Sequence, residues 1–357
     1  MPKSVLFIVP YPIHCAPSQR FRVELYETVL QKNGIQYRIA PFMDEATWAI
    51  IFKPGHSFAK LKGLVKGYGR RIAHLFDSLQ YDYIFVHREA TPLGPPVWEW
   101  IVTHLFRKKM IFDFDDAIWI PRITKGNGLA RWFKNFGKTK YLCRWATLVS
   151  GGNNFLNQFA VQNGAQKTVF LPTVVDVIHK HNKVKKHHEG KPVVGWTGSH
   201  STLFYLDAFM PILQTLQEQF DFTFLVIADK SPDLPLCDWQ FIQWNEETEV
   251  ADLLRMDIGI MPLKADKWSE GKCGFKLIQY MSCGIPSLAD PVGVNKDIID
   301  DGINGFLCTN TEQWSEKLSQ LIQFPELRRE MGEKGREKIV QSYSLQSQEE
   351  KFIALFN

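Results

Sequence analysis

The sequence predicts an α/β protein built from doubly wound parallel sheets. Short apolar runs alternate with amphipathic helical stretches almost from end to end of the 357-residue chain. Strands separated by helices favour parallel sheets joined by right-handed crossovers. At roughly 150 residues per domain, the length indicates two such domains.

A break in this pattern separates the two halves. Residues 180–190 are polar, basic and nearly free of apolar side chains. They predict a linker before a new strand, and a long surface loop within one domain is the alternative. We expect domains over 1–180 and 191–340, with a C-terminal helix over 341–357 returning to the first. Two facing doubly wound domains would bind ligands in a cleft at the carboxyl ends of their strands.

The first half contains six predicted strands. After the first of them, Phe21, Leu25 and Val29 share one face of a helix that Gly34 would end. The strands are expected at residues 5–9, 36–40, 83–86, 110–114, 147–150 and 168–171.

The second half repeats the pattern. A helix from about residue 311 carries Trp314, Leu318 and Leu321 on one face, and two more helices are expected at about 326–341 and 344–357. The strands are expected at residues 193–197, 222–228, 241–243, 258–261, 287–289 and 306–308.

Composition narrows the class of protein. No apolar run reaches the roughly 18 residues of a membrane span, and the first run meets Pro10 and Pro12, which indicates a strand rather than a signal peptide. The six cysteines are scattered, so neither a disulfide framework nor a zinc site is indicated, and a cytoplasmic protein is expected. The net charge of +4 conceals two unlike halves: residues 1–190 hold 27 Lys and Arg against 13 Asp and Glu, and residues 191–357 hold 15 against 25.

The densest functional signal lies in residues 270–286, EGKCGFKLIQYMSCGIP. A helix is expected to begin near Gly274, and a helix N-terminus offers free N–H groups and a partial positive charge. Lys272 precedes this helix, Lys276 lies in its first turn, and Gln279 shares a face with Lys276. The combination suits a diphosphate joined to a ribose. The alternative is that both lysines are solvated surface residues.

Residues 274–286 and 292–307 resemble the signature of the retaining GT-B glycosyltransferases of family four, the glycosyl transferases group 1. The resemblance extends to residues 170–176 and 194–198 and is stronger in the second half. It implies the GT-B fold of two Rossmann-like domains, with a nucleotide-sugar donor on the C-terminal domain and an acceptor on the N-terminal domain. The donor-loop residues that it implies include Cys273, Gly274 and Phe275.

The chain departs from the family pattern at two places. The family usually has two glutamates eight positions apart, and here Gln279 and Gly271 stand there, with Glu270 beside Gly271. Gln279 can still bond ribose hydroxyls, more weakly than a carboxylate. The family also places an Arg and a Lys after the first strand of the second domain, where this chain has neither, so Lys272 and Lys276 are expected to supply that charge.

Other donor-side candidates lie in two loops. Gly198 and Ser199 are expected to approach the phosphates, and His200 either donates to one of them or is simply exposed. Glu246 lies in a loop that lines the nucleotide in similar proteins. The alternative for Glu246 is an acid that the dipole favours near a helix N-terminus.

Three carboxylates, Asp113, Asp115 and Asp116, end the strand at 110–114. Clustered carboxylates raise each other's pKa, so we expect one of them to hold a proton near neutrality. The family commonly has a histidine facing the reacting sugar in this loop, so Asp115 or Asp116 is the candidate that positions the acceptor hydroxyl and takes its proton. Alternatively, Asp116 caps a helix, or Asp113 and Asp115 form the Asp-x-Asp of metal-dependent GT-A glycosyltransferases.

The acceptor side has three further candidates. Arg20 lies at the start of the helix after the first strand, and His87 and Arg88 follow the strand at 83–86. The alternative is that they are surface residues.

Residues 46–76 contain six cations and no acid, with apolar residues between them. This predicts a basic amphipathic surface helix that binds anionic lipid, and hence a peripheral protein at the inner face of the cell membrane. A basic solvated face is the alternative, and no nucleic-acid recognition motif accompanies the charge. The cations are Lys53, Lys60, Lys62, Lys66, Arg70 and Arg71.

Together these features predict a retaining glycosyltransferase of class EC 2.4. Lys276 would stabilise the leaving diphosphate, so neither a cofactor nor a metal ion is expected beyond the nucleoside-diphosphate sugar. The acceptor would be a glycan or a lipid-linked glycan, as in bacterial surface polysaccharide or lipopolysaccharide synthesis. The alternatives are a catalytically weak glycosyltransferase-like accessory protein and another GT-B enzyme such as a nucleotide-sugar epimerase.

Overall fold

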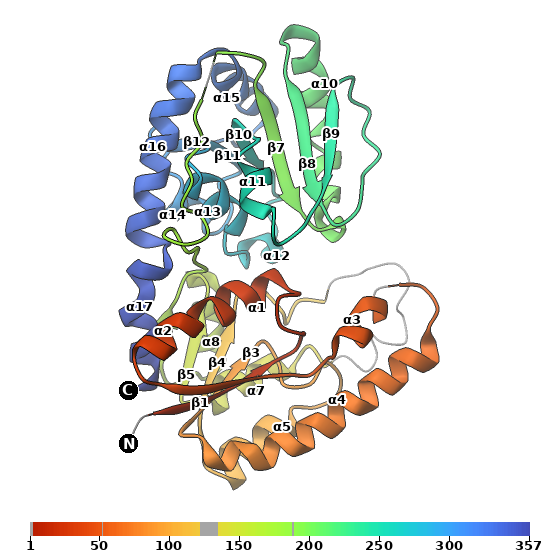
Figure 1. The fold of residues 1–357 in the computed structure, drawn as a ribbon, viewed down its shortest axis with the longest axis vertical. Helices are drawn as coiled ribbons and strands as arrows, with labels where there is room; N and C mark the ends of the chain where they lie inside the picture. The colour runs from red at the N-terminus through yellow and green to blue at the C-terminus, as the bar shows by residue number, and fades with distance from the viewer. Residues whose placement is uncertain (1–2, 52, 122–134, 188) are drawn as a thin grey trace. The chain divides into compact units, whose positions relative to one another are not determined.

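The computed structural model describes residues 3–51, 53–121, 135–187 and 189–357. The chain forms two compact units, Met1–Thr173 with Glu349–Asn357, and Val174–Gln348 (Figure 1). We call them unit 1 and unit 2.

Unit 1 is built on a six-stranded sheet with the order β2-β1-β3-β4-β5-β6, in which every neighbouring pair is parallel. All six predicted strands are confirmed to within two residues at each end. The first strand is completely buried from Val5 to Val9. The strands are β1 Ser4–Val9, β2 Gln36–Pro41, β3 Tyr83–His87, β4 Lys109–Phe114, β5 Leu148–Gly151 and β6 Thr168–Phe170.

One predicted helix of unit 1 is interrupted. The stretch containing Phe21 and Val29 divides at Val23, whose φ and ψ of −127° and −63° are not helical. Arg22 and Glu24 are both buried on either side of this break. In a continuous helix, residues two apart point to opposite sides, so the interruption lets both charged side chains face inward. The helical segments of unit 1 are α1 Pro17–Arg22, η1 Glu24–Tyr26, α2 Glu27–Lys32, α3 Glu45–Ile51, α4 Ser57–Asp77, η2 Ser78–Gln80, α5 Val97–Trp100, η3 Ile101–Leu105, α7 Lys138–Trp145 and α8 Asn154–Gln162.

The last residues of the chain pack into the core of unit 1. They comprise the end of α17 Leu345–Ile353 and η5 Ala354–Phe356. Phe352 stacks on Tyr26 with ring centroids 3.8 Å apart, and Phe356 meets the ring of Phe7 edge-on at 6.2 Å. Such aromatic pairs contribute beyond their buried area, so this tail is an integral part of the unit.

Unit 2 holds a second six-stranded parallel sheet, with the order β12-β11-β10-β7-β8-β9. The six strands predicted for the second half are confirmed to within two residues at each end. They are β7 Val193–Gly198, β8 Thr223–Ala228, β9 Trp239–Gln243, β10 Ile258–Met261, β11 Ser287–Ala289 and β12 Gly305–Leu307. The helical segments are η4 His200–Thr202, α9 Phe204–Asp207, α10 Met210–Gln219, α11 Glu249–Leu253, α12 Lys267–Glu270, α13 Phe275–Ser282, α14 Asn295–Ile298, α15 Thr311–Gln323 and α16 Pro325–Ser342.

The described part of the basic stretch at 180–190 belongs to unit 2 and packs closely on the rest of that unit. Lys185 Nζ lies 3.0 Å from Asp257 Oδ1, and His187 Nε2 lies 3.0 Å from the carbonyl oxygen of Gly284. His181 is completely buried. The polar composition of this stretch therefore reflects specific contacts with the unit as well as solvation.

Within the described part of the chain, no helix combines the length and the apolar character that a membrane crossing requires.

Candidate functional site

The strongest candidate site in unit 2 is the loop that leads into α13. Gly274 is the N-cap of this helix and has a φ of +63°, a left-handed conformation that glycine adopts without strain. A Cβ atom at this position would also lie 2.3 Å from Ile298 Cδ1. The loop is thus fixed by close packing, and the eight-residue helix begins at Phe275, close to the predicted position.

Lys272 and Lys276 stand over aromatic rings at this helix start. Lys276 Nζ lies 5.1 Å from the centroid of Trp196, on β7. Lys272 Nζ lies 5.7 Å from the centroid of Tyr205 and 5.8 Å from that of Trp268. Ring faces attract cations, so the three aromatic side chains hold the two ammonium groups near one another.

Lys276 is the more perturbed of the two lysines. Burial, followed by the charge of Lys272, lowers the pKa of Lys276 from 10.5 to about 7. Among the described residues, the one charged group that acts on Lys276 is Lys272, and no carboxylate pairs with it. A bound anion would offset both effects, so the electrostatics of this site favour a negatively charged ligand.

Three predicted donor residues surround the lysines along the same segment. Cys273 is 8% and Gln279 is 4% exposed, and Phe275 is half-buried. Within the described ranges, the hydrogen bond found at Gln279 is to its backbone carbonyl oxygen, from the Ser282 hydroxyl, and none involves its side-chain amide. Both its N–H groups and its carbonyl oxygen therefore remain for a ligand hydroxyl.

The loop after β7 is shaped by protein contacts. A Cβ atom on Gly198 would lie 2.5 Å from the Trp196 ring, so packing alone already requires a glycine there. The Ser199 hydroxyl lies 2.7 Å from that of Ser201. Asp229 accepts a hydrogen bond from the backbone N–H of His200 and lies 2.5 Å from its Nδ1, which fixes the imidazole and leaves Nε2 for another partner.

Glu246 precedes α11 and lies 3.3 Å from Lys180 Nζ. The helix itself starts at Glu249, with Thr248 as its N-cap. Glu246 is therefore outside the first turn, where the helix dipole would favour an acid.

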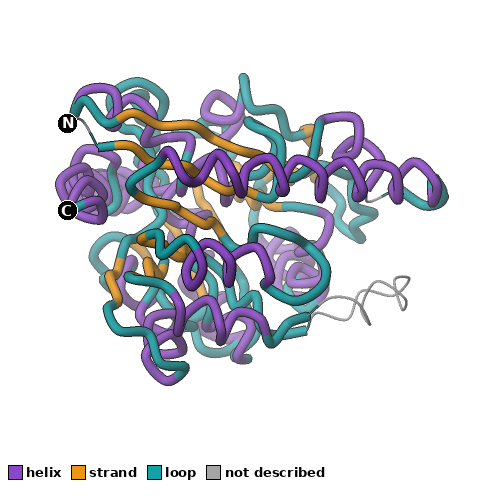
Figure 2. The backbone as a smooth tube through the Cα atoms, turned by 90° about the horizontal axis from the view of Figure 1, so that it is seen from below, coloured by secondary structure: helices purple, strands orange, loops and turns teal. Residues whose placement is uncertain are grey.

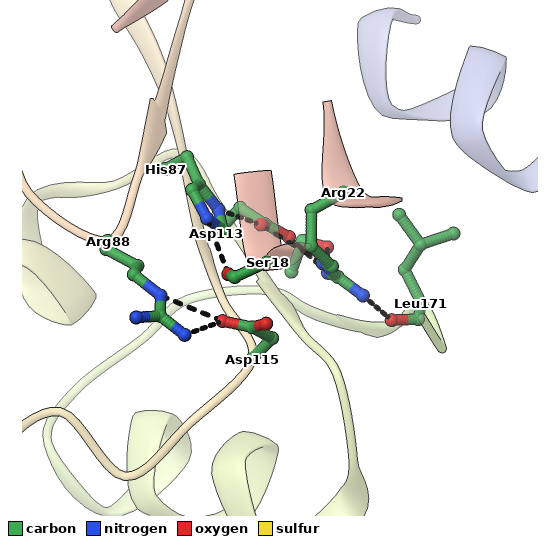
Figure 3. A network of polar contacts seen from close by, with 8 residues as sticks. Ser18, Arg22, His87, Arg88, Asp113, Asp115 and Leu171 are labelled. Carbon is green, nitrogen blue, oxygen red and sulfur yellow. Dashed lines mark hydrogen bonds and ion pairs between the residues drawn. The ribbon is translucent and has the colours of Figure 1, made fainter. Parts of the chain in front are cut away.

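In unit 1, a buried polar network joins the ends of three elements (Figure 3). Ser18 Oγ, on α1, lies 2.9 Å from His87 Nε2, at the end of β3. His87 Nδ1 lies 2.8 Å from Asp113 Oδ2, on β4. Arg22 donates to both oxygens of Asp113 and to the carbonyl oxygen of Leu171. Arg22, His87 and Asp113 have completely buried side chains, so the network is held rigidly.

A second arginine–carboxylate pair lies beside this network. Arg88 Nε and Nη2 lie 2.9 and 2.7 Å from Asp115 Oδ1. The Arg88 guanidinium, opposing the effect of burial, holds the pKa of Asp115 well below its usual range. The charge of Arg22 likewise lowers the pKa of Asp113 against burial.

These arginines correct one prediction from the sequence. We expected the clustered carboxylates to raise each other's pKa, so that one would be protonated near neutrality. Instead, Asp113 and Asp115 have lowered pKa values because each faces a guanidinium group at close range. The same pairs bear on the Asp-x-Asp metal alternative, because both oxygens of Asp113 and Oδ1 of Asp115 already accept hydrogen bonds from guanidinium groups.

The other unit 1 candidates have local contacts. The Asp116 carboxylate accepts a hydrogen bond at 3.0 Å from the N–H of Ala117, and no helix begins there within the described residues, so the capping alternative is wrong. Arg20 is 4% exposed, with its guanidinium 4.9 Å from the Phe21 ring centroid, which contradicts the surface alternative.

Sequence reasoning missed several residues that shape these sites. Ser18 and Arg22 belong to the unit 1 network, although only their position beside Arg20 singled them out. Trp196 and Tyr205 lie more than 60 positions before the lysines that they contact, and no local pattern connects them. The other members of the two unit 1 networks, His87, Arg88, Asp113 and Asp115, were candidates because they lie at or just after the ends of predicted strands.

The two parallel sheets and their strand orders define the fold class, which is that of the GT-B glycosyltransferases. Sucrose-phosphate synthase from Thermosynechococcus elongatus aligns with a TM-score of 0.71 and 11% identity, over 99% of this chain and 98% of that chain. Anabaena HepE in complex with UDP and glucose aligns with a TM-score of 0.64 and 13% identity, over 99% of both chains.

Sequence comparison finds similarity to one family within unit 2. Residues 236–338 match the model of Glycosyl transferases group 1. N-acetyl-alpha-D-glucosaminyl L-malate synthase of Bacillus anthracis is 33% identical over 101 residues, which are 28% of this chain and 26% of that protein. The matched segment thus spans about a quarter of this curated relative. These findings confirm the predicted family resemblance and the GT-B fold.

Proposed function

We propose that the protein is a retaining glycosyltransferase that moves a sugar from a nucleoside-diphosphate sugar to an acceptor hydroxyl. The observation that carries this proposal is the pair of lysines at the start of α13, where Lys276 lacks a carboxylate partner among the described residues. The complex of Anabaena HepE with UDP and glucose supports the same choice of donor class.

Unit 2 would hold the donor. As the bond to the anomeric carbon breaks, negative charge grows on the leaving phosphate, and groups already fixed in position stabilise it without reorganising. Lys272, Lys276 and the N–H groups of the first turn of α13 supply this field in our proposal. The Gln279 side-chain amide would donate a hydrogen bond to a ribose hydroxyl or accept one from it. The mechanism needs no metal ion, because the lysines provide the positive charge.

Unit 1 would hold the acceptor. Asp115 is ionised and oriented by Arg88, so it is suited to accept a hydrogen bond from the acceptor hydroxyl and to align it for attack. Its lowered pKa makes it a weak base. We therefore assign it a positioning role, with the hydroxyl proton leaving on the departing phosphate.

The finer identity of the acceptor is also a proposal. The excess of cations in residues 1–190 suits an anionic or membrane-linked glycan. We propose a glycan or lipid-linked acceptor of bacterial surface polysaccharide or lipopolysaccharide synthesis, met by a peripheral protein at the inner face of the cell membrane.

A nucleotide panel followed by a product assay tests the transfer reaction. We expect UDP, ADP or GDP to raise the melting temperature, because a ligand at 100 times its Kd stabilises a protein by about 2.7 kcal/mol. The matching nucleotide sugars are then incubated with the protein and with simple glycosides. Transfer with retained anomeric configuration supports the proposal. Donor isomerisation would indicate an epimerase, and nucleotide binding without any turnover of donor would indicate an accessory protein.

A further inference from the structure

The long helix α4 presents an apolar stripe to solvent. Phe58 is 81% exposed and Val65 is 63% exposed, with Leu61, Ile72 and Phe76 between 57% and 62%. Residues at this spacing lie along one side of a helix. We call these five residues the α4 stripe. The opposite side of the helix is buried at Gly63, Gly67, Arg71 and His74.

The packing of α4 fixes the stripe on the outside. A Cβ atom at Gly63 would lie 2.3 Å from Thr47 Oγ1, and one at Gly67 would lie 2.5 Å from the Phe42 ring. Arg71 donates to the carbonyl oxygens of Val9, Ala40 and Ala90 at 2.6 to 2.8 Å. The helix cannot rotate to bury the stripe without losing these contacts.

A second group of exposed apolar residues lies on neighbouring elements. Val97 and Trp100 on α5 and Leu105 on η3 are 54%, 46% and 65% exposed. We call these three residues the α5–η3 patch. Two hydrogen bonds join its elements to the α4 side: Trp98 Nε1 donates to the Arg71 carbonyl oxygen at 2.8 Å, and Lys108 Nζ donates to the Leu79 carbonyl oxygen at 2.7 Å. Figure 1 shows α4 and α5 side by side in unit 1.

The charges around this surface are positive. Lys62 and Lys66 are exposed on the flank of the α4 stripe, and residues 46–76 contain no acid. Asp77, which follows, pairs with Arg38 at 2.8 Å. The structure also revises the predicted basic face, because Arg70 bonds Asp44 and the Phe42 carbonyl, and Arg71 is buried. The lysines supply the exposed charge, and the apolar stripe is the larger feature.

We propose that the α4 stripe and the α5–η3 patch insert into the headgroup region of an anionic phospholipid bilayer, with Lys62 and Lys66 at its surface. An exposed apolar helix face edged by lysines is the pattern of helices that lie in the membrane interface, and tryptophan favours the same depth. Stable binding needs both signals, because each cation or apolar side chain alone contributes little. In Figure 2, α4 is the long helix that crosses unit 1.

A second copy of the chain fits this surface less well. A twofold contact brings the same patch of both copies together, so Lys62 and Lys66 would meet a surface that carries the same lysines and no acid from residues 46–76. A bilayer containing acidic lipid satisfies the apolar and the charged groups together. The inference deepens the proposed function. It rests on that function only in one respect, which is that membrane binding would give the protein access to a membrane-linked acceptor.

Vesicle flotation of the full chain tests this inference without any sugar substrate. The probes are vesicles of phosphatidylcholine alone and vesicles with about one-third phosphatidylglycerol. We expect the protein to float with the anionic vesicles and to bind the neutral ones at least about tenfold more weakly. The double variant Leu61→Asp, Ile72→Asp should lose binding by more than about tenfold. The matched control Ile303→Asp, Phe324→Asp changes two exposed apolar residues of unit 2, 60% and 54% exposed, and should bind as the unaltered protein does.

Each other outcome overturns the inference. The inference is overturned if the protein floats with neither type of vesicle or binds the neutral and the anionic vesicles equally. It is also overturned if the Leu61→Asp, Ile72→Asp variant binds anionic vesicles as the unaltered protein does. A dimer in solution that this double variant dissociates would assign the surface to a second copy. Melting temperatures with nucleoside diphosphates, measured on the same variants, keep the donor site separate. If vesicle binding fails while nucleotide binding persists, only the membrane inference falls.

Discussion

The charged groups of the two candidate sites have opposite kinds of neighbours in the two units. In unit 1, Arg22 pairs with Asp113 and Arg88 pairs with Asp115, so each carboxylate has its own guanidinium. In unit 2, Lys276 faces Lys272 and an aromatic ring, and its pKa is lowered. Charges that are already balanced hold a geometry, whereas a cation kept near another cation favours an incoming anion. The comparison therefore supports our proposal that unit 1 orients the acceptor and unit 2 binds the diphosphate.

The largest effect is expected from the Arg22→Ala substitution. It leaves Asp113 buried without its strongest partner, and breaking such a pair typically costs about 3–5 kcal/mol of unfolding free energy. Urea unfolding monitored by circular dichroism measures the loss.

The matched control for that substitution is Arg38→Ala. Arg38 pairs with Asp77 at 2.8 Å, but its side chain is 52% exposed, so the loss should stay below about 1 kcal/mol. Equal losses in the two variants would mean that burial does not set the strength of the unit 1 network, and the orienting role would lose its basis.

The contrast between buried apolar strands and buried charged side chains explains how much of the fold the sequence could predict. The strands appear in the sequence as short runs rich in apolar residues, and all twelve were predicted within two residues of their observed ends. Arg22 and Arg71 could not be predicted as buried, because a single arginine carries no local sign of the carbonyl or carboxylate that it will meet. The interruption at Val23 follows from the same buried charges, so it was missed for the same reason.

The next effect concerns nucleotide binding in unit 2. The Lys276→Met substitution removes the ammonium group but keeps an unbranched chain against Trp196. A charge-assisted hydrogen bond contributes about 1.5–3 kcal/mol, so we expect UDP, or whichever diphosphate binds, to bind roughly 10–100-fold more weakly in titration calorimetry.

Lys317→Met is the control for this substitution. Lys317 Nζ lies 5.2 Å from the Phe306 centroid, much as Lys276 Nζ lies 5.1 Å from Trp196, but Lys317 is outside the candidate site. Its loss should leave diphosphate binding unchanged. Unchanged binding by Lys276→Met would remove the assignment of α13 as the diphosphate site and, with it, the contrast between the units.

A smaller, pH-dependent effect sharpens the same contrast. Lys276 has a pKa of about 7 in the folded protein, against 10.5 for an ordinary lysine. Only the protonated form attracts a diphosphate, so affinity should fall as the pH rises above 7, by at most about tenfold per unit. Calorimetry between pH 6 and about 9 measures this slope, which Lys276→Met should abolish.

The same lowered pKa has the opposite effect on the stability of the ligand-free protein. Between pH 7 and 10.5 the unfolded chain binds more protons at Lys276 than the folded chain does. This residue's contribution to unfolding free energy therefore rises with pH over that interval, whereas diphosphate affinity falls. A diphosphate affinity that stays constant from pH 6 to about 9 would show that Lys276 does not contact the ligand.

The sequence predicted part of the candidate site for a clear physical reason. Lys272, Lys276 and Gln279 occupy one short segment, where helical spacing places them together. The rings beneath the lysines and the arginines beside the aspartates come from distant segments, and only the folded sheet brings them close. The wrong prediction of a protonated carboxylate arose because the acids were local in the sequence and their arginine partners were not.

The smallest effect is expected from Glu246→Gln. Its carboxylate lies 3.3 Å from Lys180 Nζ, and the two side chains are 26% and 47% exposed, so unfolding free energy should change by less than about 0.5 kcal/mol. Because Lys180 already engages this carboxylate, we also expect diphosphate affinity to fall by less than about threefold. Calorimetry with the bound nucleotide measures it. A loss of affinity of tenfold or more, with stability unchanged, would place Glu246 on the nucleotide. Unit 2 would then use a carboxylate as well as lysines to bind its ligand, and the contrast with the carboxylates of unit 1 would be weaker.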